Sequence, residues 1–364
     1  MTANTRHLDA LTGIRGLAAW LVVLYHLRLS LTALLPHSVI AVFAKGYLAV
    51  DLFFMLSGFV IWYNYADRLR GGGWAETRLF LWRRFARVWP LHALILGAYV
   101  AFVAILLLTG RSTDGYPLAQ LPMHLLLVQN WGFTSDLSWN HPAWSISTEF
   151  AAYLVFPVIA LGARPEKWSV RTLLLLAGAL IVALYAQFAR FGYSALGDAI
   201  PQMGLWRCLI GFALGNVLCL LWRQVRPRAG IARLAGLGCG LILVLGWALQ
   251  LHEAIVAPAA FFTGLLALAS ARGRTVRLLG GRALTYLGEI SYSTYLGHFL
   301  LWIVWKILFV DASMQIGWAG FAGFLAAVFA ASVLLHQGVE KPAQRWLNAR
   351  PPRWAMRPAA VPAE

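Results

Sequence analysis

Residues 8–29, LDALTGIRGLAAWLVVLYHLRL, decide how this chain folds. The stretch is apolar enough to cross a membrane as one helix, yet it carries Arg15 and His26. Eleven positions of about 100° each bring the two side chains within about 20° of one another around the helix axis. They lie roughly 16 Å apart along that axis, about half of the hydrocarbon core. Because ionisable groups in lipid are costly, this face is expected to line a buried site. The alternative is that both residues lie at helix ends, with Arg15 snorkelling to the surface.

The composition of the chain indicates a polytopic membrane protein. Of 364 residues, 60% are hydrophobic and 12% are charged, whereas a soluble protein is about half apolar and a quarter charged. The net charge of +16 suggests nucleic acid at first, but its placement along the chain argues against that partner. The three cysteines, Cys208, Cys219 and Cys239, lie in apolar runs without metal-ligand spacing. They are interpreted as packing residues, and no metal site is expected.

The hydropathy pattern predicts an all-α integral membrane protein with about ten transmembrane helices. Most of the 30 Lys and Arg residues fall in alternate loops and at the two ends of the chain, so both termini are expected in the cytoplasm. We expect residues 1–336 to form the transmembrane domain and 337–364 a disordered, basic, Pro-rich cytoplasmic tail. Residues 110–142 are expected to contain an interfacial or re-entrant helix. The apolar runs are 10–29, 46–66, 90–109, 143–162, 172–189, 203–222, 234–250, 255–271, 288–309 and 316–336.

Five polar residues on different predicted helices fall at a similar depth in the outer half of the membrane. They are His26, Asp51, Glu149, Arg207 and His298. Because each would be costly alone in lipid, we expect them to converge on one hydrated cavity. A histidine beside a carboxylate can deprotonate a hydroxyl, the carboxylate holding the imidazole in one tautomer. The alternative is that Glu149 only pairs with Arg207 and holds helices together.

A basic segment, residues 67–90, follows the second apolar run. Arg83, Arg84 and Arg87 lie within about one helical turn, and Arg68 and Arg70 lie across the predicted loop. The positive-inside rule and lipid headgroups can explain much of this charge. The preference for Arg over Lys favours phosphate, which guanidinium groups bind bidentately. A cytosolic phosphorylated cofactor with a long thioester arm could reach His26 past Arg15.

Six ordered motifs cover nearly the whole chain, and they resemble acyltransferase family 3, the integral-membrane O-acyltransferases. The motifs are LDALTGIRGLAAWLVVLYH, AVDLFFMLSGFVI, RRFARVWPLH, PAWSISTEF, LGEISYSTYLGHF and VEKPAQRWL. The resemblance implies an acyl-CoA donor, usually acetyl-CoA from the cytoplasm, and often a glycan acceptor on the outer side. It also implies that His26 is the catalytic base and that Arg15, Arg68 and Arg70 support the donor or its path. Glu149 becomes the acid or the orienting partner of His26.

The sequence and the resemblance together predict a membrane-bound O-acyltransferase. It is expected in a bacterial inner membrane, with acyl-CoA as co-substrate, no tightly bound cofactor, and a carbohydrate or lipid-linked glycan as acceptor. Membrane lipids are expected partners and nucleic acid is not. Arg207 or Trp144 could stabilise the oxyanion, and Tyr295 could carry the acyl group. Two alternatives are a transporter or flippase for a lipid-linked sugar, which needs no acyl transfer, and a signalling or scaffold membrane protein.

Overall fold

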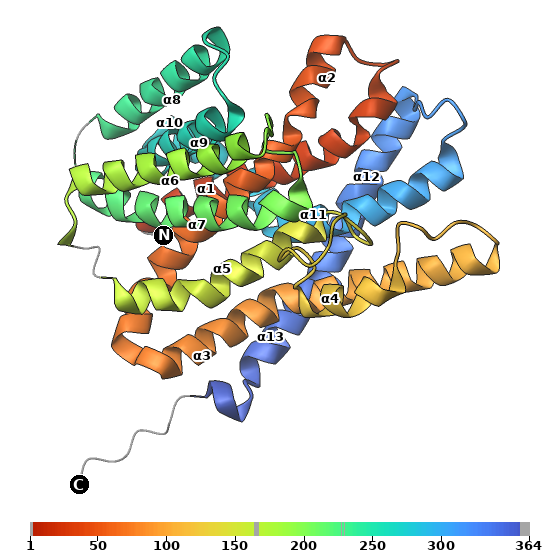
Figure 1. Ribbon diagram of the computed structural model, residues 1–364, viewed down its shortest axis with the longest axis horizontal. Coiled ribbons are helices and arrows are strands. Elements are labelled where there is room, and N and C mark those ends of the chain that lie inside the picture. The colour runs from red at the N-terminus through yellow and green to blue at the C-terminus, as the bar shows by residue number, and fades with distance from the viewer. Residues whose placement is uncertain (1–2, 164–166, 227, 229, 357–364) are drawn as a thin grey trace.

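The computed structural model describes residues 3–163, 167–226, 228 and 230–356, and side chains from residue 9 onward. The described chain is helical, without a strand in these ranges (Figure 1). Its α-helices are α1 (Ala3–Leu27), α2 (His37–Ala44), α3 (Ala49–Leu108), α4 (Leu121–Leu126), α5 (Ala143–Gly162), α6 (Val170–Arg190), α7 (Ile200–Val225), α8 (Ile231–Ala248), α9 (Glu253–Ser270), α10 (Arg274–Leu279), α11 (Arg282–Phe309), α12 (Trp318–Leu335) and α13 (Lys341–Ala349). This confirms the predicted all-α class.

Eight helical segments of the described chain are long and apolar enough to cross a membrane. One of them, His37–Leu108, has 72 residues, whereas one crossing needs about 20. Its helix α3 is interrupted at Gly73, with φ 53° and ψ −136°, a conformation that only glycine adopts without strain. Figure 1 shows α3 reversing its direction at the lower left. The basic segment predicted as a loop is therefore the tip of a helical hairpin. The count of ten spans stays a prediction.

Two helix pairs are packed through glycine. A Cβ atom on Gly288 of α11 would lie 1.9 Å from the carbonyl oxygen of Thr12 in α1, and one on Gly16 would lie 2.7 Å from the Gly288 nitrogen. In the same way, a Cβ on Gly58 of α3 would lie 2.0 Å from the carbonyl oxygen of Phe212 in α7. Small residues permit such backbone contact between membrane helices. The contacts place α1 beside α11, and α3 beside α7.

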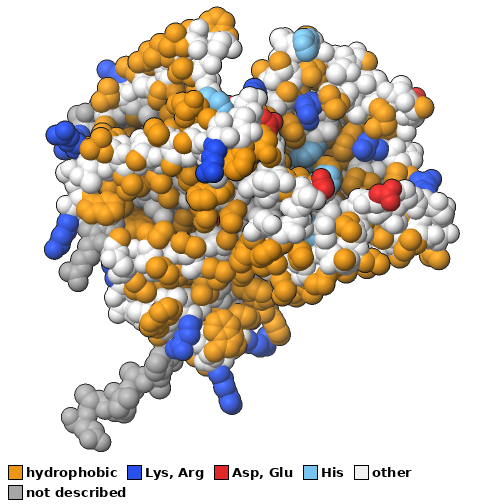
Figure 2. Space-filling model, in the orientation of Figure 1, with side chains coloured by type: hydrophobic (Ala, Val, Ile, Leu, Met, Phe, Trp, Pro, Cys, Tyr) orange, Lys and Arg blue, Asp and Glu red, His pale blue; other side chains and the backbone are white. Residues whose placement is uncertain are grey.

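The outer surface of the helices is apolar, as a membrane protein requires. On α8, Leu237 and Trp247 are 67% and 78% exposed, which is the exposure expected of side chains that face lipid. Figure 2 shows hydrophobic side chains spread over the visible face, together with a hollow that contains histidine side chains.

One local expectation is wrong. Residues 337–356 do not form a disordered tail, because a π-helical turn, His336–Glu340, continues into α13. The indole Nε1 of Trp82 donates a hydrogen bond to the carbonyl of Leu347 (3.0 Å), which holds α13 against α3. Residues 357–364 lie outside the described residues.

Residues 110–142, expected to contain an interfacial or re-entrant helix, form a short 3-10 helix, Leu118–Gln120, followed by the six-residue α4. The place of this helix relative to the membrane stays a prediction. Leu127 stops α4 in the left-handed conformation, with φ 60°. The segment is held instead by side chains, since His92 Nε2 donates to the carbonyl of His124 (2.7 Å) and His124 Nε2 donates to Ser138 Oγ (3.0 Å).

Candidate functional site

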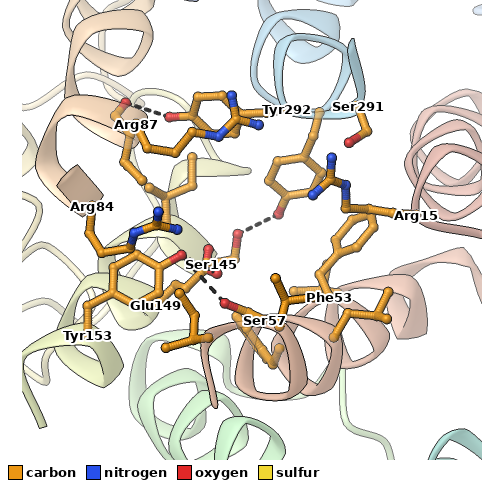
Figure 3. Close-up of a pocket in the computed structure, with 18 of the residues that line it drawn as sticks. Arg15, Phe53, Ser57, Arg84, Arg87, Ser145, Glu149, Tyr153, Ser291 and Tyr292 are labelled. Atoms are coloured by element: carbon orange, nitrogen blue, oxygen red, sulfur yellow. Dashed lines mark hydrogen bonds between the residues drawn. The ribbon is translucent and has the colours of Figure 1, made fainter. Parts of the chain in front are cut away.

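A cavity of about 260 Å³ lies between α1, α3, α5 and α11 (Figure 3). Three guanidinium groups and one carboxylate line it, so that its lining carries net positive charge and favours an anionic ligand. No group of three or more His, Cys, Asp or Glu side chains suited to a metal ion occurs in the described ranges. The polar lining consists of Thr12, Arg15, Ser57, Asn64, Arg84, Arg87, Ser145, Glu149, Tyr153, Ser291, Tyr292 and Tyr295.

Arg15 is fixed at one wall of the cavity by a single backbone oxygen. Its Nε and Nη2 atoms donate to the carbonyl of Gly288, at 3.2 and 2.6 Å. The hydroxyl of Ser291 donates to the same oxygen, at 2.7 Å. The guanidinium plane is thereby oriented toward the cavity (Figure 3). Its other N–H groups can meet a ligand, since an arginine carries five donors.

Arg84 lies on the opposite side of the cavity from Arg15 (Figure 3). Its Nη2 atom donates to the hydroxyl of Tyr65, at 2.9 Å. Its Nε atom is buried and has no hydrogen-bond partner among the described residues. Since an unpaired buried donor costs free energy, the Arg84 guanidinium keeps unused hydrogen-bonding capacity at the cavity wall.

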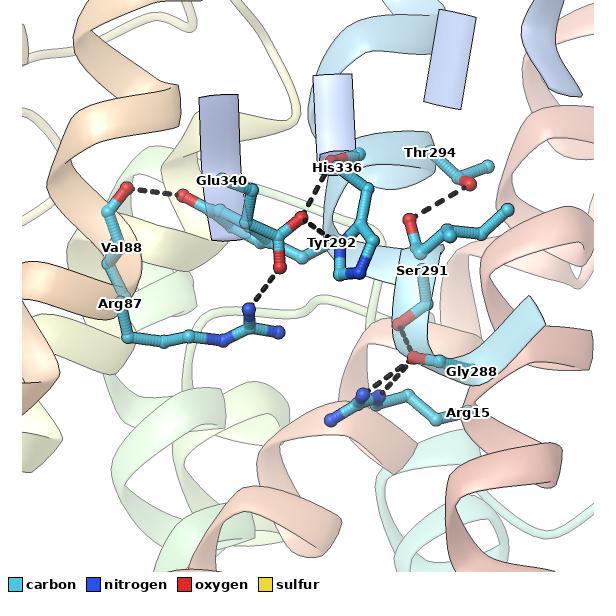
Figure 4. A network of polar contacts seen from close by, with 11 residues as sticks. Arg15, Arg87, Val88, Gly288, Ser291, Tyr292, Thr294, His336 and Glu340 are labelled. Atoms are coloured by element: carbon cyan, nitrogen blue, oxygen red, sulfur yellow. Dashed lines mark hydrogen bonds and ion pairs between the residues drawn. The ribbon is translucent and has the colours of Figure 1, made fainter. Parts of the chain in front are cut away.

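Arg87, the third guanidinium, is held by a carboxylate that the sequence interpretation did not assign. Glu340, only 2% exposed, forms an ion pair with Arg87 and accepts a hydrogen bond from Ser293 Oγ (2.6 Å) (Figure 4). The Nδ1 atom of His336 lies 3.1 Å from the same carboxylate. The motif VEKPAQRWL carries this residue. A glutamate before a helix is ordinary in sequence, so only the motif itself could have pointed to Glu340.

The other three arginines predicted to bind the donor do not line the cavity. Arg70 donates from Nε to the carbonyl of Ala160 (2.9 Å) and lies 3.6 Å from Asp67. Arg68 is exposed, and Arg83 is half-buried outside the cavity. Arg68 and Arg70 precede the turn at Gly73 and Arg83 follows it, and none of the three enters the cavity wall.

Glu149 lines the cavity, but it does not contact His26 or Arg207. Its Oε1 atom accepts a hydrogen bond from the hydroxyl of Tyr153, one turn later on α5, at 2.6 Å. The Tyr153 hydroxyl also lies 3.5 Å from Ser57 Oγ. The expected pairing of Glu149 with the His26 imidazole is therefore not observed in the described structure, and neither is a pair with Arg207.

The predicted single chamber for five polar residues is wrong. Asp51 and Arg207 form a buried two-pronged ion pair, with N–O distances of 2.7 and 3.1 Å. The guanidinium of Arg207 also lies 5.1 Å from the centre of the Trp144 ring. None of these three residues lines the cavity. Depth along a helix does not fix which way a side chain faces, and buried charges are stabilised by pairing with each other.

His26 lies beside His298, and neither imidazole lines the cavity. Nδ1 of His26 is 3.1 Å from Nε2 of His298. Tyr295, which lines the cavity, has its ring 6.2 Å from the His298 ring. Its hydroxyl contacts Ser145 Oγ (2.8 Å) and donates to the Pro142 carbonyl (3.0 Å). Tyr295 and Glu149 thus line the cavity, and the Tyr295 ring lies beside the ring of His298.

Outside the spanning helices, His124 shows most clearly how burial changes the pKa of a side chain. Burial, and after it the nearby His92 and His141, together lower the pKa of His124 from 6.5 to about 4. The ring is therefore neutral at physiological pH, with Nε2 donating to Ser138. Burial also lowers the pKa of His141, which stacks on Phe299 at 5.0 Å. Neutral imidazoles therefore line this outer segment.

Comparison with known proteins identifies the chain's relatives. An acyltransferase-domain family matches residues 8–337. The chain is 30% identical over 389 residues to acyltransferase MdmB of Streptomyces mycarofaciens, covering 97% of this chain and 95% of that protein. It is 32% identical over 194 residues to protein 2 in the picA locus of Rhizobium radiobacter, covering 48% of this chain and 92% of that protein. No solved structure matches the chain. The family match over most of the chain shows that this protein belongs to acyltransferase family 3.

Proposed function

We propose that this protein is an O-acyltransferase that moves an acyl group from cytosolic acyl-CoA to a hydroxyl group of a carbohydrate, with His26 as general base. The observation that supports this most directly is the arginine-lined cavity, whose wall residue Tyr295 borders the His26–His298 pair. Acyl transfer itself follows from the family. The donor, the acceptor and the role of His26 are the steps proposed here, and a bacterial inner membrane is the proposed location.

Acyl-CoA is the donor whose chemistry fits the cavity. Its phosphates are multiply charged, and guanidinium groups bind phosphate through pairs of N–H groups. Arg15 and Arg84 face each other across the cavity, and the Nε atom of Arg84 is buried without a partner. The pantetheine arm is long and flexible, so that it can carry the thioester from these arginines toward Tyr295. Acetyl-CoA is the smallest donor of this class and the natural probe.

His26 is proposed to act by direct transfer. In the proposed step, its imidazole takes the proton of the acceptor hydroxyl, and the oxygen attacks the thioester carbonyl. A new C–O bond forms, the C–S bond breaks, and the leaving thiolate recovers the proton from the imidazolium. The imidazole ring is half-buried, which leaves it part-accessible to an acceptor. A carbohydrate acceptor is supported by the family resemblance.

The experiment measures transfer of ¹⁴C-acetyl from acetyl-CoA in membrane vesicles from a host strain without the gene, which supply the acceptor. Vesicles carry wild type, His26→Ala, Arg84→Gln, or the matched control His37→Ala, a histidine exposed on α2. We expect alkali-labile label with wild type and His37→Ala. His26→Ala is expected to abolish it, and Arg84→Gln to raise the donor KM about tenfold.

The outcomes separate the competing functions. If His26→Ala kept full turnover, His26 would not be the base. Movement of a lipid-linked sugar without label transfer would favour the transporter or flippase. Absence of acetyl-CoA binding to purified wild type would leave a scaffold or signalling protein, or another acyl donor, and would contradict the proposed donor.

A further inference from the structure

A second imidazole, that of His298 on α11, lies against His26 and has no assigned role in acyl transfer. His298 is 1% exposed, and its Nε2 atom is 3.1 Å from Nδ1 of His26. The two helices that carry these residues pack closely along their length, with backbone contact at Gly16 and Gly288. The contact between the rings is therefore a built feature of the α1–α11 interface.

Two backbone carbonyls fix where the protons of this pair are. Nδ1 of His298 is 3.1 Å from the carbonyl oxygen of Thr294, and Nδ1 of His26 is 3.0 Å from that of Val22. A carbonyl oxygen can only accept, so each Nδ1 must carry a hydrogen. In the neutral ring of His298, Nε2 then holds a lone pair. Nε2 of His298 can therefore only accept a hydrogen bond, and its donor is the Nδ1–H of His26. This one N–H group donates both to the carbonyl oxygen of Val22 and to Nε2 of His298.

The same hydrogen bonds decide which atom of His26 is basic. With Nδ1 protonated, the neutral ring has its lone pair on Nε2. This Nε2 atom has no hydrogen-bond partner among the described residues, and it is not among the enclosed polar atoms. It is the atom of His26 left for an acceptor hydroxyl. The ring cannot turn freely, because Tyr25 and Phe299 lie edge-on to it, each 5.0 Å away between ring centres.

We propose that His298 is a positioning residue that holds His26 in the Nδ1–H tautomer and so directs the Nε2 lone pair at the acceptor hydroxyl. The inference rests on the proposed function, in which His26 is the general base. When Nε2 takes the hydroxyl proton, the ring becomes an imidazolium, and its Nδ1–H bond to His298 becomes charge-assisted and stronger. His298 thus stabilises the charge that develops on His26 while its own Nδ1–H stays on Thr294.

This arrangement assigns to His298 the part that Glu149 was expected to play. An orienting partner must contact the base, and Glu149 is instead bonded by Tyr153. In serine proteases, loss of the orienting group lowers kcat by about 10⁴, because the imidazole takes the wrong tautomer. The neutral imidazole of His298 is a weaker partner than a carboxylate, so the expected loss is smaller.

The test compares two substitutions of nearly equal shape. His298→Gln keeps an acceptor oxygen close to the place of Nε2, whereas His298→Met fills the space without one. The readouts are kcat for ¹⁴C-acetyl transfer in the vesicles, the Kd for acetyl-CoA of purified protein, and the thermal unfolding midpoint in detergent. If either variant does not fold, His298→Asn and His298→Leu, also matched in shape, replace the pair.

We expect His298→Met to lower kcat about a hundredfold while the Kd for acetyl-CoA changes less than twofold. His298→Gln is expected to keep at least ten times the kcat of His298→Met at a similar unfolding midpoint. Equal kcat values for the two variants, or a kcat of His298→Met above a third of wild type, would overturn the positioning role. The variant His26→Ala separates the two proposals. If His26→Ala is fully active, the proposed function is contradicted. If His26→Ala is inactive while His298→Met is active, only the positioning role of His298 is contradicted.

Discussion

The carboxylate of Glu340 and the guanidinium of Arg87 join the C-terminal helical segment to the wall of the cavity. Glu340 lies in a π-helical turn, a feature that is often found at functional sites. Its second oxygen is held by the hydroxyl of Ser293. The pair therefore fixes a cavity arginine from outside the cavity (Figure 4).

Replacing Glu340 by glutamine tests whether this ion pair matters for the donor. Glu340→Gln keeps the shape and loses the charge, so Arg87 is free to leave the cavity wall. We expect the KM for acetyl-CoA to rise about fivefold to tenfold with a smaller change in kcat. Glu289→Gln, at an exposed position on α11, is the matched control and should leave both constants unchanged. A drop in kcat alone would contradict a role at the donor.

The Asp51–Arg207 pair predicts a stability effect that is separate from catalysis. Removing one partner of a buried ion pair costs about 3–5 kcal/mol, whereas replacing both by apolar residues is often neutral. We expect Asp51→Leu to lower the unfolding midpoint in detergent strongly, and Asp51→Leu with Arg207→Met to recover most of it. A double variant as unstable as the single one would contradict the pair as the cause.

The glycine contact between α1 and α11 predicts a large effect from one methyl group. Gly288→Ala places a Cβ 1.9 Å from the Thr12 carbonyl oxygen, so the helices must separate. Overpacking of this kind costs about 1–3 kcal/mol. Gly97→Ala on α3 is the control, because no atom lies within 4 Å of its added Cβ. We expect a lower unfolding midpoint and less acyl transfer for Gly288→Ala only. Equal midpoints would show that the contact is looser than described.

Substitution of Glu149 distinguishes two roles for this residue. It either helps to bind the acyl donor in the cavity or acts as the partner of His26. Because Glu149 lines the cavity and contacts Tyr153, Glu149→Gln is expected to change the KM for acetyl-CoA severalfold and kcat less than tenfold. A kcat loss of a thousandfold with unchanged KM would instead make it the partner or acid of the chemical step. Initial rates over a range of acetyl-CoA concentrations decide between these outcomes.

The segment of residues 110–142 that holds His124 is expected to make the protein less stable in acid. The folded-state pKa of His124 lies near 4, below its unfolded value of 6.5, so the unfolded chain binds more protons between these values. Stability is therefore lost as pH falls from 6.5 toward 4. His124→Gln keeps a donor for Ser138 and removes the titration. We expect its unfolding midpoint to fall less than that of wild type between pH 7.5 and 5. Equal losses would place the acid-sensitive group elsewhere.

The fold class follows from the sequence because apolar runs of membrane length leave few alternatives. Part of the site also follows from it, since Arg15, Arg84 and Arg87 line the cavity. The partners of the buried polar residues do not follow. Depth placed Asp51, Glu149 and His26 at one level, but helix rotation decides that Asp51 meets Arg207 and that His26 meets His298.

Two further features depend on contacts between distant parts of the chain. Glu340 and Arg87 are 253 positions apart in sequence, and no local pattern predicts that they pair. The ordered α13 likewise depends on Trp82, which lies far from it along the chain. Composition alone makes such a Pro- and Arg-rich end look disordered.

The backbone contact between Gly16 and Gly288 also has a mechanical consequence. Because main chain packs on main chain, we expect α1 and α11 to move as one rigid body that carries both imidazoles. Tyr295 belongs to that body, whereas its hydroxyl partners Ser145 and Pro142 belong to the start of α5. A shift of α5 against this pair would therefore change the contacts of the Tyr295 hydroxyl and leave the contact between His26 and His298 in place.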